Sequence, residues 1–208
     1  MTLAVHPLIP DRWPDLLELF GKGGPYAGCW CMYWRQAGRE QWANAGRGNQ
    51  ERLRAIVDDR PPGLLAYRDG EPVGWCSVSP REELQRILRS PTLKPTDGDQ
   101  PSGDRPTVWS VACFYVKPGM RRHGVGRALL AEAVRYAVEH GAQVVDGYPV
   151  DPGGRRVDSA SAWTGMLSMF REAGFEEVAR RRKTRPVMRY RAVGKGHGGS
   201  SVADPAGR

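Results

Sequence analysis

Arg121-Arg122-His123-Gly124-Val125-Gly126 is the most informative segment of this chain. It follows the apolar run 108–116, which predicts a strand buried on both faces, and it begins a helical pattern that continues to Glu139. The first N–H groups of a helix lack internal partners and carry partial positive charge, so they attract anions. Glycine at 124 and 126 lets a phosphate approach the backbone, because no Cβ stands in the way. The stretch therefore predicts a phosphate-binding turn, with side-chain donors at Arg121, Arg122, His123 and Arg127.

Two common nucleotide-binding fingerprints are absent from this turn. The dinucleotide fingerprint requires a third glycine three positions after the second, and that position is Leu129. A Walker-type loop requires Lys and then Ser or Thr after its last glycine, whereas Gly126 is followed by Arg127-Ala128. The phosphate that this turn binds should therefore belong to another kind of ligand.

The surroundings of the turn are more specific. Val116-Lys117-Pro118 precedes Arg-x-x-Gly-x-Gly, and Arg127-Ala128-Leu129-Leu130 follows it. This arrangement resembles motif A of the acyl-CoA-dependent N-acetyltransferase superfamily, the GNAT fold, in which the motif follows a strand that ends Val-x-Pro. The resemblance is strongest over residues 109–175 and extends to 3–192. Cys29-Trp30-Cys31-Met32 is also similar to a stretch in an uncharacterised bacterial subgroup of that superfamily, a likeness that implies no substrate.

The order of predicted elements agrees with that fold. We expect an α/β protein with three layers, in which a mixed, mostly antiparallel, twisted sheet is flanked by helices on both faces. Residues 1–192 should form one domain, and the Gly- and Ser-rich residues 193–208 a disordered tail. The expected strands are 3–9, 64–68, 72–79, 108–116, 143–150, 176–181 and 186–192, and the expected helices are 11–20, 41–58, 81–88, 124–139 and a helix from 159 or 161 to 173, with a long loop at 90–107.

Composition excludes several other classes of protein. The 208-residue chain is 26% charged and 40% hydrophobic, as expected of a globular protein, and it lacks both a membrane-spanning apolar run and a signal-peptide pattern, which favours a cytoplasmic protein with no membrane partner. The net charge is +8, and Arg180-Arg181-Arg182-Lys183 is a basic run. Because recognisable nucleic-acid-binding motifs are missing, we interpret this run as a solvated hairpin and expect no nucleic-acid partner.

Metal binding is also not expected. Cys29-Trp30-Cys31 does not have zinc-ligand spacing, and Cys76 and Cys113 form no second pair with it. The four histidines are not clustered near these cysteines in the sequence. We therefore expect free thiols and no metal.

The resemblance implies acetyl-CoA as the co-substrate. Its pyrophosphate would lie on the turn, and its pantetheine arm would run beside the preceding strand and bond to the strand's backbone. The implied cofactor-binding residues are Phe114, Tyr115, Val116, Arg121, Arg122, His123, Gly124, Val125, Gly126 and Arg127.

The catalytic residues are less well defined by the sequence. Many family members have a tyrosine acid that begins a segment such as Tyr-Glu-Lys-x-Gly-Phe, but the matching segment here begins with Phe170. Tyr148 is either a substitute acid or a packing residue. Asp146 and Asp151 are either candidate bases or turn residues. Cys113 is either a catalytic residue that approaches the acyl group or a buried structural thiol. Catalysis by positioning alone, without a protein acid, is a further alternative.

The acceptor site is expected among aromatic residues. The candidate pocket residues are Trp30, Tyr33, Trp34, Arg35 and Trp75. Trp109 and Trp163 are further candidates for the same pocket. The alternative is that these tryptophans form part of the hydrophobic core. The leading hypothesis is transfer of an acetyl group to a primary amine of a small molecule, by direct attack in a ternary complex. The alternatives are a non-catalytic acyl-CoA-binding or sensory module and a protein N-acetyltransferase, and a homodimer is left open.

Overall fold

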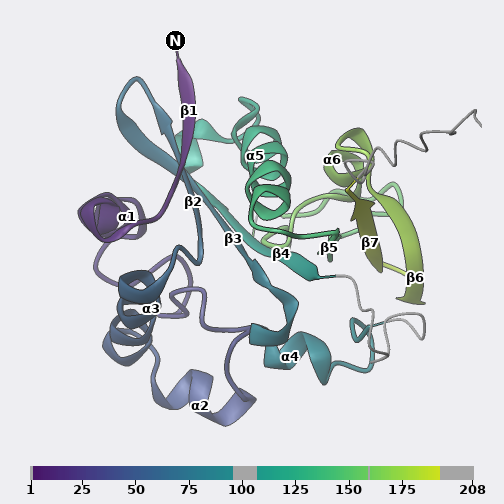
Figure 1. The fold of residues 1–208 in the computed structure, drawn as a ribbon, viewed down its shortest axis with the longest axis horizontal. Coiled ribbons are helices and arrows are strands. Elements are labelled where there is room, and N and C mark those ends of the chain that lie inside the picture. Colours follow the sequence, from purple (N-terminus) through teal and green to yellow (C-terminus); the bar gives the residue numbers. More distant parts are fainter. Residues whose placement is uncertain (1, 96–106, 159, 193–208) are drawn as a thin grey trace, which may run out of the picture.

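A seven-stranded sheet runs through the computed structural model, which describes residues 2–95, 107–158 and 160–192 (Figure 1). The strand order is β1-β2-β3-β4-β5-β7-β6. Only β4 and β5 are parallel among these neighbours, and they are joined by a helical crossover, as parallel strands require. The strands are β1 (Leu3–Pro7), β2 (Gly63–Arg68), β3 (Glu71–Pro80), β4 (Val108–Val116), β5 (Val144–Gly147), β6 (Glu176–Arg182) and β7 (Arg185–Arg191).

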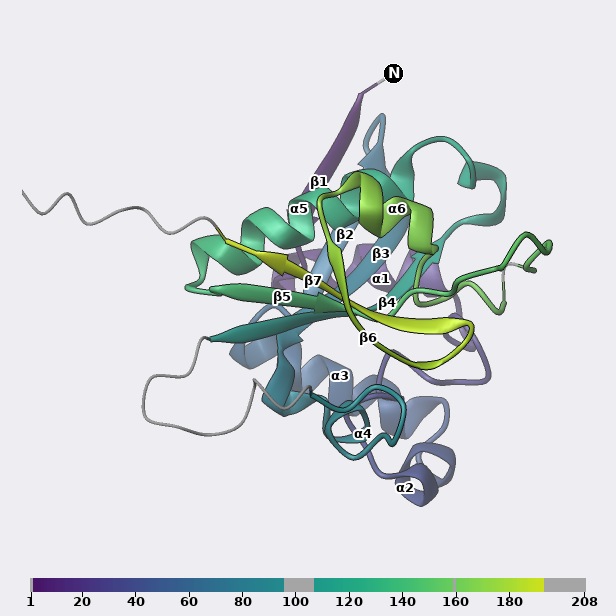
Figure 2. The ribbon, with the colours of Figure 1, turned by 90° about the vertical axis from the view of Figure 1, so that its right-hand side faces the viewer.

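Helices cover both faces of this sheet (Figure 2). One face carries α5 (Val125–Glu139) and α6 (Leu167–Glu172), and the other carries α1 (Trp13–Phe20), α2 (Gly38–Ala43), α3 (Arg47–Asp59) and α4 (Gln85–Leu88). The short helices η1 (Pro10–Arg12), η2 (Arg81–Glu83) and η4 (Pro118–Met120) lie in connections. The predicted three-layer, mostly antiparallel α/β architecture is confirmed.

Small residues set two features of the sheet. The β2–β3 hairpin turns at Asp69 and Gly70, whose φ angles of 50° and 90° suit a two-residue hairpin turn. At Gly74 on β3, a Cβ would lie 2.7 Å from Cγ1 of Val125, so the absence of a side chain lets α5 pack closely against the sheet. Val125, Leu129 and Ala137 of α5 are buried in the core beneath this helix.

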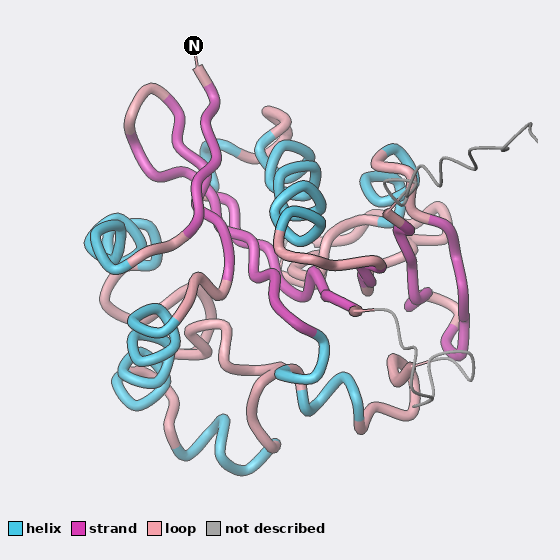
Figure 3. Tube along the Cα trace, viewed as in Figure 1, coloured by secondary structure: helices cyan, strands magenta, loops and turns pink. Residues whose placement is uncertain are grey.

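Several predicted elements differ from the structure (Figure 3). The strand expected at 3–9 ends at Pro7, and the helix expected at 81–88 is divided into η2 and α4. Three further differences have a cause in a tertiary contact or a backbone constraint. The helix expected at 41–58 is split into α2 and α3, since Gly46 adopts a φ of 80° and donates its N–H to the carbonyl of Gly28. The strand expected at 143–150 ends at Gly147, two residues before Pro149. The helix expected from 159 or 161 begins only at Leu167, because Gly165 has a φ of 85°.

Two other predictions concern residues outside the described part of the chain. The tail at 193–208 lies there entirely, as does most of the loop expected at 90–107. Within that loop, residues 90–95 form turns that β6 holds in place, because Arg181 donates hydrogen bonds to the carbonyls of Lys94 and Pro95.

Candidate functional site

The turn between β4 and α5 has the geometry of an anion site. Arg122 and Gly124 both adopt left-handed backbone conformations, with φ angles of 65° and 79°. Such alternations turn successive N–H groups toward one side of the chain. No side chain caps the N-terminus of α5, and the N–H of Ala128 donates to the carbonyl of Gly124 at 3.0 Å. A Cβ at Gly124 would have no atom within 4 Å, so the space beside this backbone is open. The N–H groups of the first turn are thus available to a ligand.

The basic side chains of the turn take different positions. Arg121 donates from Nε to the carbonyl of Val116 at 3.2 Å, which fixes its side chain beside the end of β4. The ring of His123 lies 2.8 Å from the carbonyl of Arg121 through Nδ1. Arg127 points to α6, where its Nε lies 2.6 Å from Glu172. Arg121 is thus held beside the end of β4, whereas Arg127 joins α5 to α6.

A second feature of the site is the place where β4 and β5 part. Their pairing ends at Val111 and Gly147. On the other side of β4, Ser77 pairs with Cys113 and Val78 with Val111, so Ala112 is an extra residue that forms a bulge. Bulges bend a strand and redirect its polar groups, and they are common beside active sites. After the bulge, the edge of β4 on the β5 side no longer pairs with β5.

Two tryptophans cover that edge. Trp34 donates from Nε1 to the carbonyl of Ala112 at 3.0 Å, and the N–H of Phe114 donates to the carbonyl of Trp163 at 2.7 Å. The two indole rings stack on each other, with centroids 5.2 Å apart and planes inclined by 23°. The ring of Tyr33 meets both edge-on. The structure thus brings together Tyr33, Trp34 and Trp163.

The other aromatic candidates lie elsewhere. Trp30 and Trp75 are buried among side chains of α1 and α3, both in edge-on contact with Phe20. Trp75 donates from Nε1 to the sulfur of Cys31 at 3.0 Å. Arg35 forms an ion pair with Glu83, and only 7% of its side chain is exposed. This geometry favours core packing for the two tryptophans and a structural ion pair for Arg35.

Tyr148 is the candidate acid with the simplest environment. Its hydroxyl oxygen lies 3.0 Å from Oγ of Ser110 on β4, and its side chain is buried beside Trp34 and Ala112. Burial, followed by the negative charge of Asp146, raises the pKa of Tyr148 well above its usual value. The group therefore stays protonated and can act as a hydrogen-bond donor at neutral pH.

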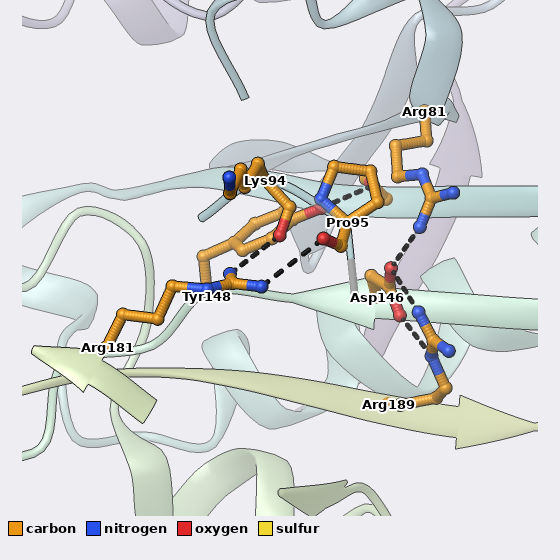
Figure 4. Close-up of polar contacts among 8 residues, drawn as sticks. Arg81, Lys94, Pro95, Asp146, Tyr148, Arg181 and Arg189 are labelled. Carbon is orange, nitrogen blue, oxygen red and sulfur yellow. Dashed lines mark hydrogen bonds and ion pairs between the residues drawn. The ribbon is translucent and has the colours of Figure 1, made fainter. Parts of the chain in front are cut away.

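Asp146 lies between two arginines (Figure 4). Its Oδ2 accepts from Arg81 at 2.9 Å and from Arg189 at 3.0 Å, and its Oδ1 accepts from Nε of Arg189 at 2.8 Å. The carboxylate side chain is only 2% exposed. Because both oxygens are engaged, this geometry favours a structural role in which Asp146 joins β5 to β7 and η2.

Asp151 and Cys113 also have local partners. Asp151 accepts from the N–H of Gly153 at 3.0 Å and pairs with Arg180 at 2.7 Å, and these two contacts lower its pKa. The sulfur of Cys113 lies 3.7 Å from that of Cys31. The hydrogen bond to Cys113, followed by burial, raises the pKa of Cys31, so this thiol stays protonated. The alternatives of a turn residue and a buried thiol both agree with these contacts.

Phe170 stands at the position where the sequence resemblance implies a tyrosine acid in many other proteins. Its ring is fully buried, meets the ring of Phe114 edge-on at 6.2 Å, and fills the space over Gly147, where a Cβ would overlap it. Sequence analysis missed the partners Arg81, Ser110 and Arg189. The position of Asp146 inside an apolar strand could have indicated that basic partners such as Arg81 and Arg189 exist, because a buried charge needs an opposite charge.

The described part of the chain, residues 2–95, 107–158 and 160–192, contains neither a metal-binding cluster nor a membrane-spanning helix. No group of three or more His, Cys, Asp or Glu side chains in these ranges could hold a metal ion. Among the helices of the same ranges, none combines the length and apolarity needed to cross a bilayer.

Comparison with known proteins identifies the kind of fold. The model of the acetyltransferase (GNAT) family matches residues 13–151. Among curated protein sequences, none matches the chain. Similar solved structures include the PaiA N-acetyltransferase of Thermoplasma acidophilum in complex with coenzyme A, at 12% identity and a TM-score of 0.51, with 92% of this chain and 100% of that chain covered. The GNAT domain of PAT from S. lividans is 18% identical with a TM-score of 0.51, and 92% of each chain is covered. A chain of the NatC complex bound to Gag peptide and CoA is 10% identical with a TM-score of 0.52, covering 93% of this chain and 100% of that chain.

Proposed function

Because the chain belongs to the acetyltransferase (GNAT) family, we propose that it transfers an acetyl group from acetyl-CoA to a primary amine by direct attack in a ternary complex. The observation that carries this proposal is the uncapped N-terminus of α5, which adjoins the part of β4 that has no neighbouring strand on the β5 side after Val111. An anion site and an unpaired strand edge, joined by one short connection, suit a ligand with a pyrophosphate and a chain of amide groups.

The residues of the turn fit such a ligand. The N–H groups between Arg122 and Arg127 would hold the pyrophosphate, with Arg121 and Arg122 supplying additional charge. The backbone of Phe114, Tyr115 and Val116 would bond to the pantetheine amides in the manner of an added strand. The bound thioester would supply the acyl group.

Catalysis would then depend on groups beside the β4 bulge. The N–H of Phe114 points to the side that β5 has left, since it already donates to a carbonyl there, and it is suited to polarise a thioester carbonyl. Tyr148 is the proposed proton donor to the departing thiolate, because it is protonated and its side chain lies in one cluster with Trp34 and Ala112 at the bulge. Asp146, Asp151 and Cys113 are weaker proposals, since each is engaged by a local partner.

The acceptor is proposed to be a small amine that binds against Tyr33 and Trp34. Aromatic faces attract ammonium groups, and Arg86 already lies over the ring of Tyr33, 3.9 Å from its centroid. A peptide N-terminus is the second candidate acceptor. An amine panel that includes small polyamines, amino acids and short peptides, read by release of free CoA thiol, would distinguish the two.

A non-catalytic acyl-CoA-binding module is the second candidate function. The observation that favours it is Phe170, which puts a buried ring without a hydroxyl at the place of the usual acid. Binding of acetyl-CoA without thiol release across the whole amine panel would support this alternative.

The binding step can be tested with two matched glycine variants. Gly124 and Gly141 lie at opposite ends of α5, have φ angles of 79° and 86°, and would both place a Cβ in open space. Gly124→Asp puts a carboxylate where the phosphate is proposed to bind, and it should lower acetyl-CoA affinity by more than 10-fold in calorimetry. Gly141→Asp carries the same backbone strain and charge and should leave affinity unchanged. Equal affinities for the two variants, or no binding by the unmodified protein, would refute the proposal.

A further inference from the structure

The carbonyl of Trp163 occupies the backbone donor that the proposed function assigns to the thioester. The N–H of Phe114 donates to this carbonyl at 2.7 Å, which is a short and fully formed hydrogen bond. An N–H that is engaged at this distance has no room for a second carbonyl acceptor in line with its proton. Trp163 and a thioester carbonyl therefore compete for one donor.

The side chain of Trp163 strengthens this contact. Its ring stacks on Trp34, which in turn donates to the carbonyl of Ala112, so the two polar groups of β4 next to the bulge are both satisfied by the tryptophan pair. Tyr33 closes the group from the side. The pair thus takes the place of the missing neighbour strand along this part of β4.

The backbone on the C-terminal side of Trp163 is built to turn. Gly165 has a φ of 85°, and a Cβ there would come within 2.8 Å of both Met169 and Phe170. Val150 donates to the carbonyl of Gly165, and Leu167 donates to the carbonyl of Val150, which anchors the far side of the turn. Thr164 is held in turn by Arg185 at 2.8 Å, so Trp163 would be released by a local movement of residues 160–163 that leaves Val150 and α6 in place.

We propose that Trp163 is an internal gate that holds the acyl site closed until acyl-CoA displaces its carbonyl from Phe114. This inference rests on the proposed function, since it assumes that the thioester bonds to that N–H. In the closed form the competing carbonyl satisfies Phe114, and in the open form the thioester carbonyl does. The apparent affinity for acetyl-CoA then equals the affinity of the open form multiplied by the fraction of molecules that are open.

The gate is tested by weakening the closed form. Trp163→Ala removes the ring contacts with Trp34 and Tyr33 and leaves the backbone carbonyl. Aromatic pairs contribute modestly, so we expect acetyl-CoA to bind about 3- to 10-fold more tightly to this variant in calorimetry. Trp163→Phe keeps part of the stacking and should give a smaller gain. Trp42→Ala is the control, because Trp42 is 60% exposed on α2, and its affinity should equal that of the unmodified protein.

Fluorine NMR of protein labelled with 5-fluorotryptophan provides a readout that does not depend on activity. The Trp163 signal is assigned from its absence in Trp163→Phe, which also serves if Trp163→Ala does not fold. Addition of acetyl-CoA should shift this signal toward the position of an exposed indole, while the Trp42 signal stays unchanged. If acetyl-CoA binds and the Trp163 signal does not move, the gate is refuted and the proposed function stands. If acetyl-CoA does not bind at all, the proposed function itself has failed.

Discussion

Replacing Asp146 by asparagine should lower the free energy of unfolding by about 3–5 kcal/mol. The substitution keeps the shape of the side chain and removes the charge that faces Arg81 and Arg189. Those side chains are 10% and 6% exposed, so water cannot readily replace the lost carboxylate. The cost arises mainly from the two guanidinium groups, which would be buried without their anion.

Urea denaturation followed by circular dichroism measures this cost. Asp151→Asn is the matched control, because Asp151 also pairs with an arginine but does so at the surface, where such pairs contribute about 0–1 kcal/mol. A loss below about 1 kcal/mol for Asp146→Asn, no larger than that of the control, would refute the structural role.

The same variant separates this role from that of a general base. At a temperature where the variant is fully folded, a structural residue should leave the lower limb of the pH–rate profile in place. Disappearance of that limb together with a small change in stability would show instead that Asp146 accepts a proton in the reaction.

Three further predictions concern the residues around β5. Burial raises the pKa of Tyr148 above that of the unfolded chain, so its contribution to stability is full below about pH 10 and declines as the pH rises further. Tyr148→Phe should flatten this decline in urea titrations at pH 9–11 and should also slow turnover. An unchanged dependence of the unfolding free energy on pH would contradict the raised pKa. Gly147→Ala should lower the free energy of unfolding by about 1–3 kcal/mol, because its methyl group meets the ring of Phe170. Phe170→Leu replaces that ring with a smaller side chain, so the double variant should lose less stability than the sum of the two single variants, and strictly additive losses would argue against the contact. Phe170→Tyr should cost about 1–3 kcal/mol without raising kcat, because its hydroxyl would be buried, and a gain in kcat would show that this position does reach the thioester.

The sequence was most informative where structure is decided locally. The turn at 121–126 could be predicted because an apolar strand, two glycines and an amphipathic helix follow one another within a short stretch, and each has its own physical signature. The β2–β3 hairpin was predictable for the same reason, since Asp69-Gly70 supports the positive φ angles that the turn requires.

Contacts between distant segments were out of reach of the same reasoning. The break between α2 and α3 depends on the carbonyl of Gly28, which accepts from Gly46 and from Asn49. The grouping of Trp34 with Trp163 likewise depends on how the connection between β5 and α6 returns to β4. Aromatic residues near the site could be proposed one by one, but periodicity within a segment does not indicate which of them meet.

The filling of position 170 connects the proton chemistry to the gate. The ring of Phe170 lies against the backbone of both Gly147 and Gly165, and no side chain at either glycine could coexist with it. A hydroxyl at this position would be buried near the backbone of Gly147 and Gly165, and a buried polar group without a partner is costly. Two residues before Gly165, the carbonyl of Trp163 accepts from the N–H of Phe114, whose ring also meets that of Phe170. Phe170 thus packs against both the end of β5 and the turn before α6, and in the proposed mechanism the proton comes from Tyr148 and not from position 170.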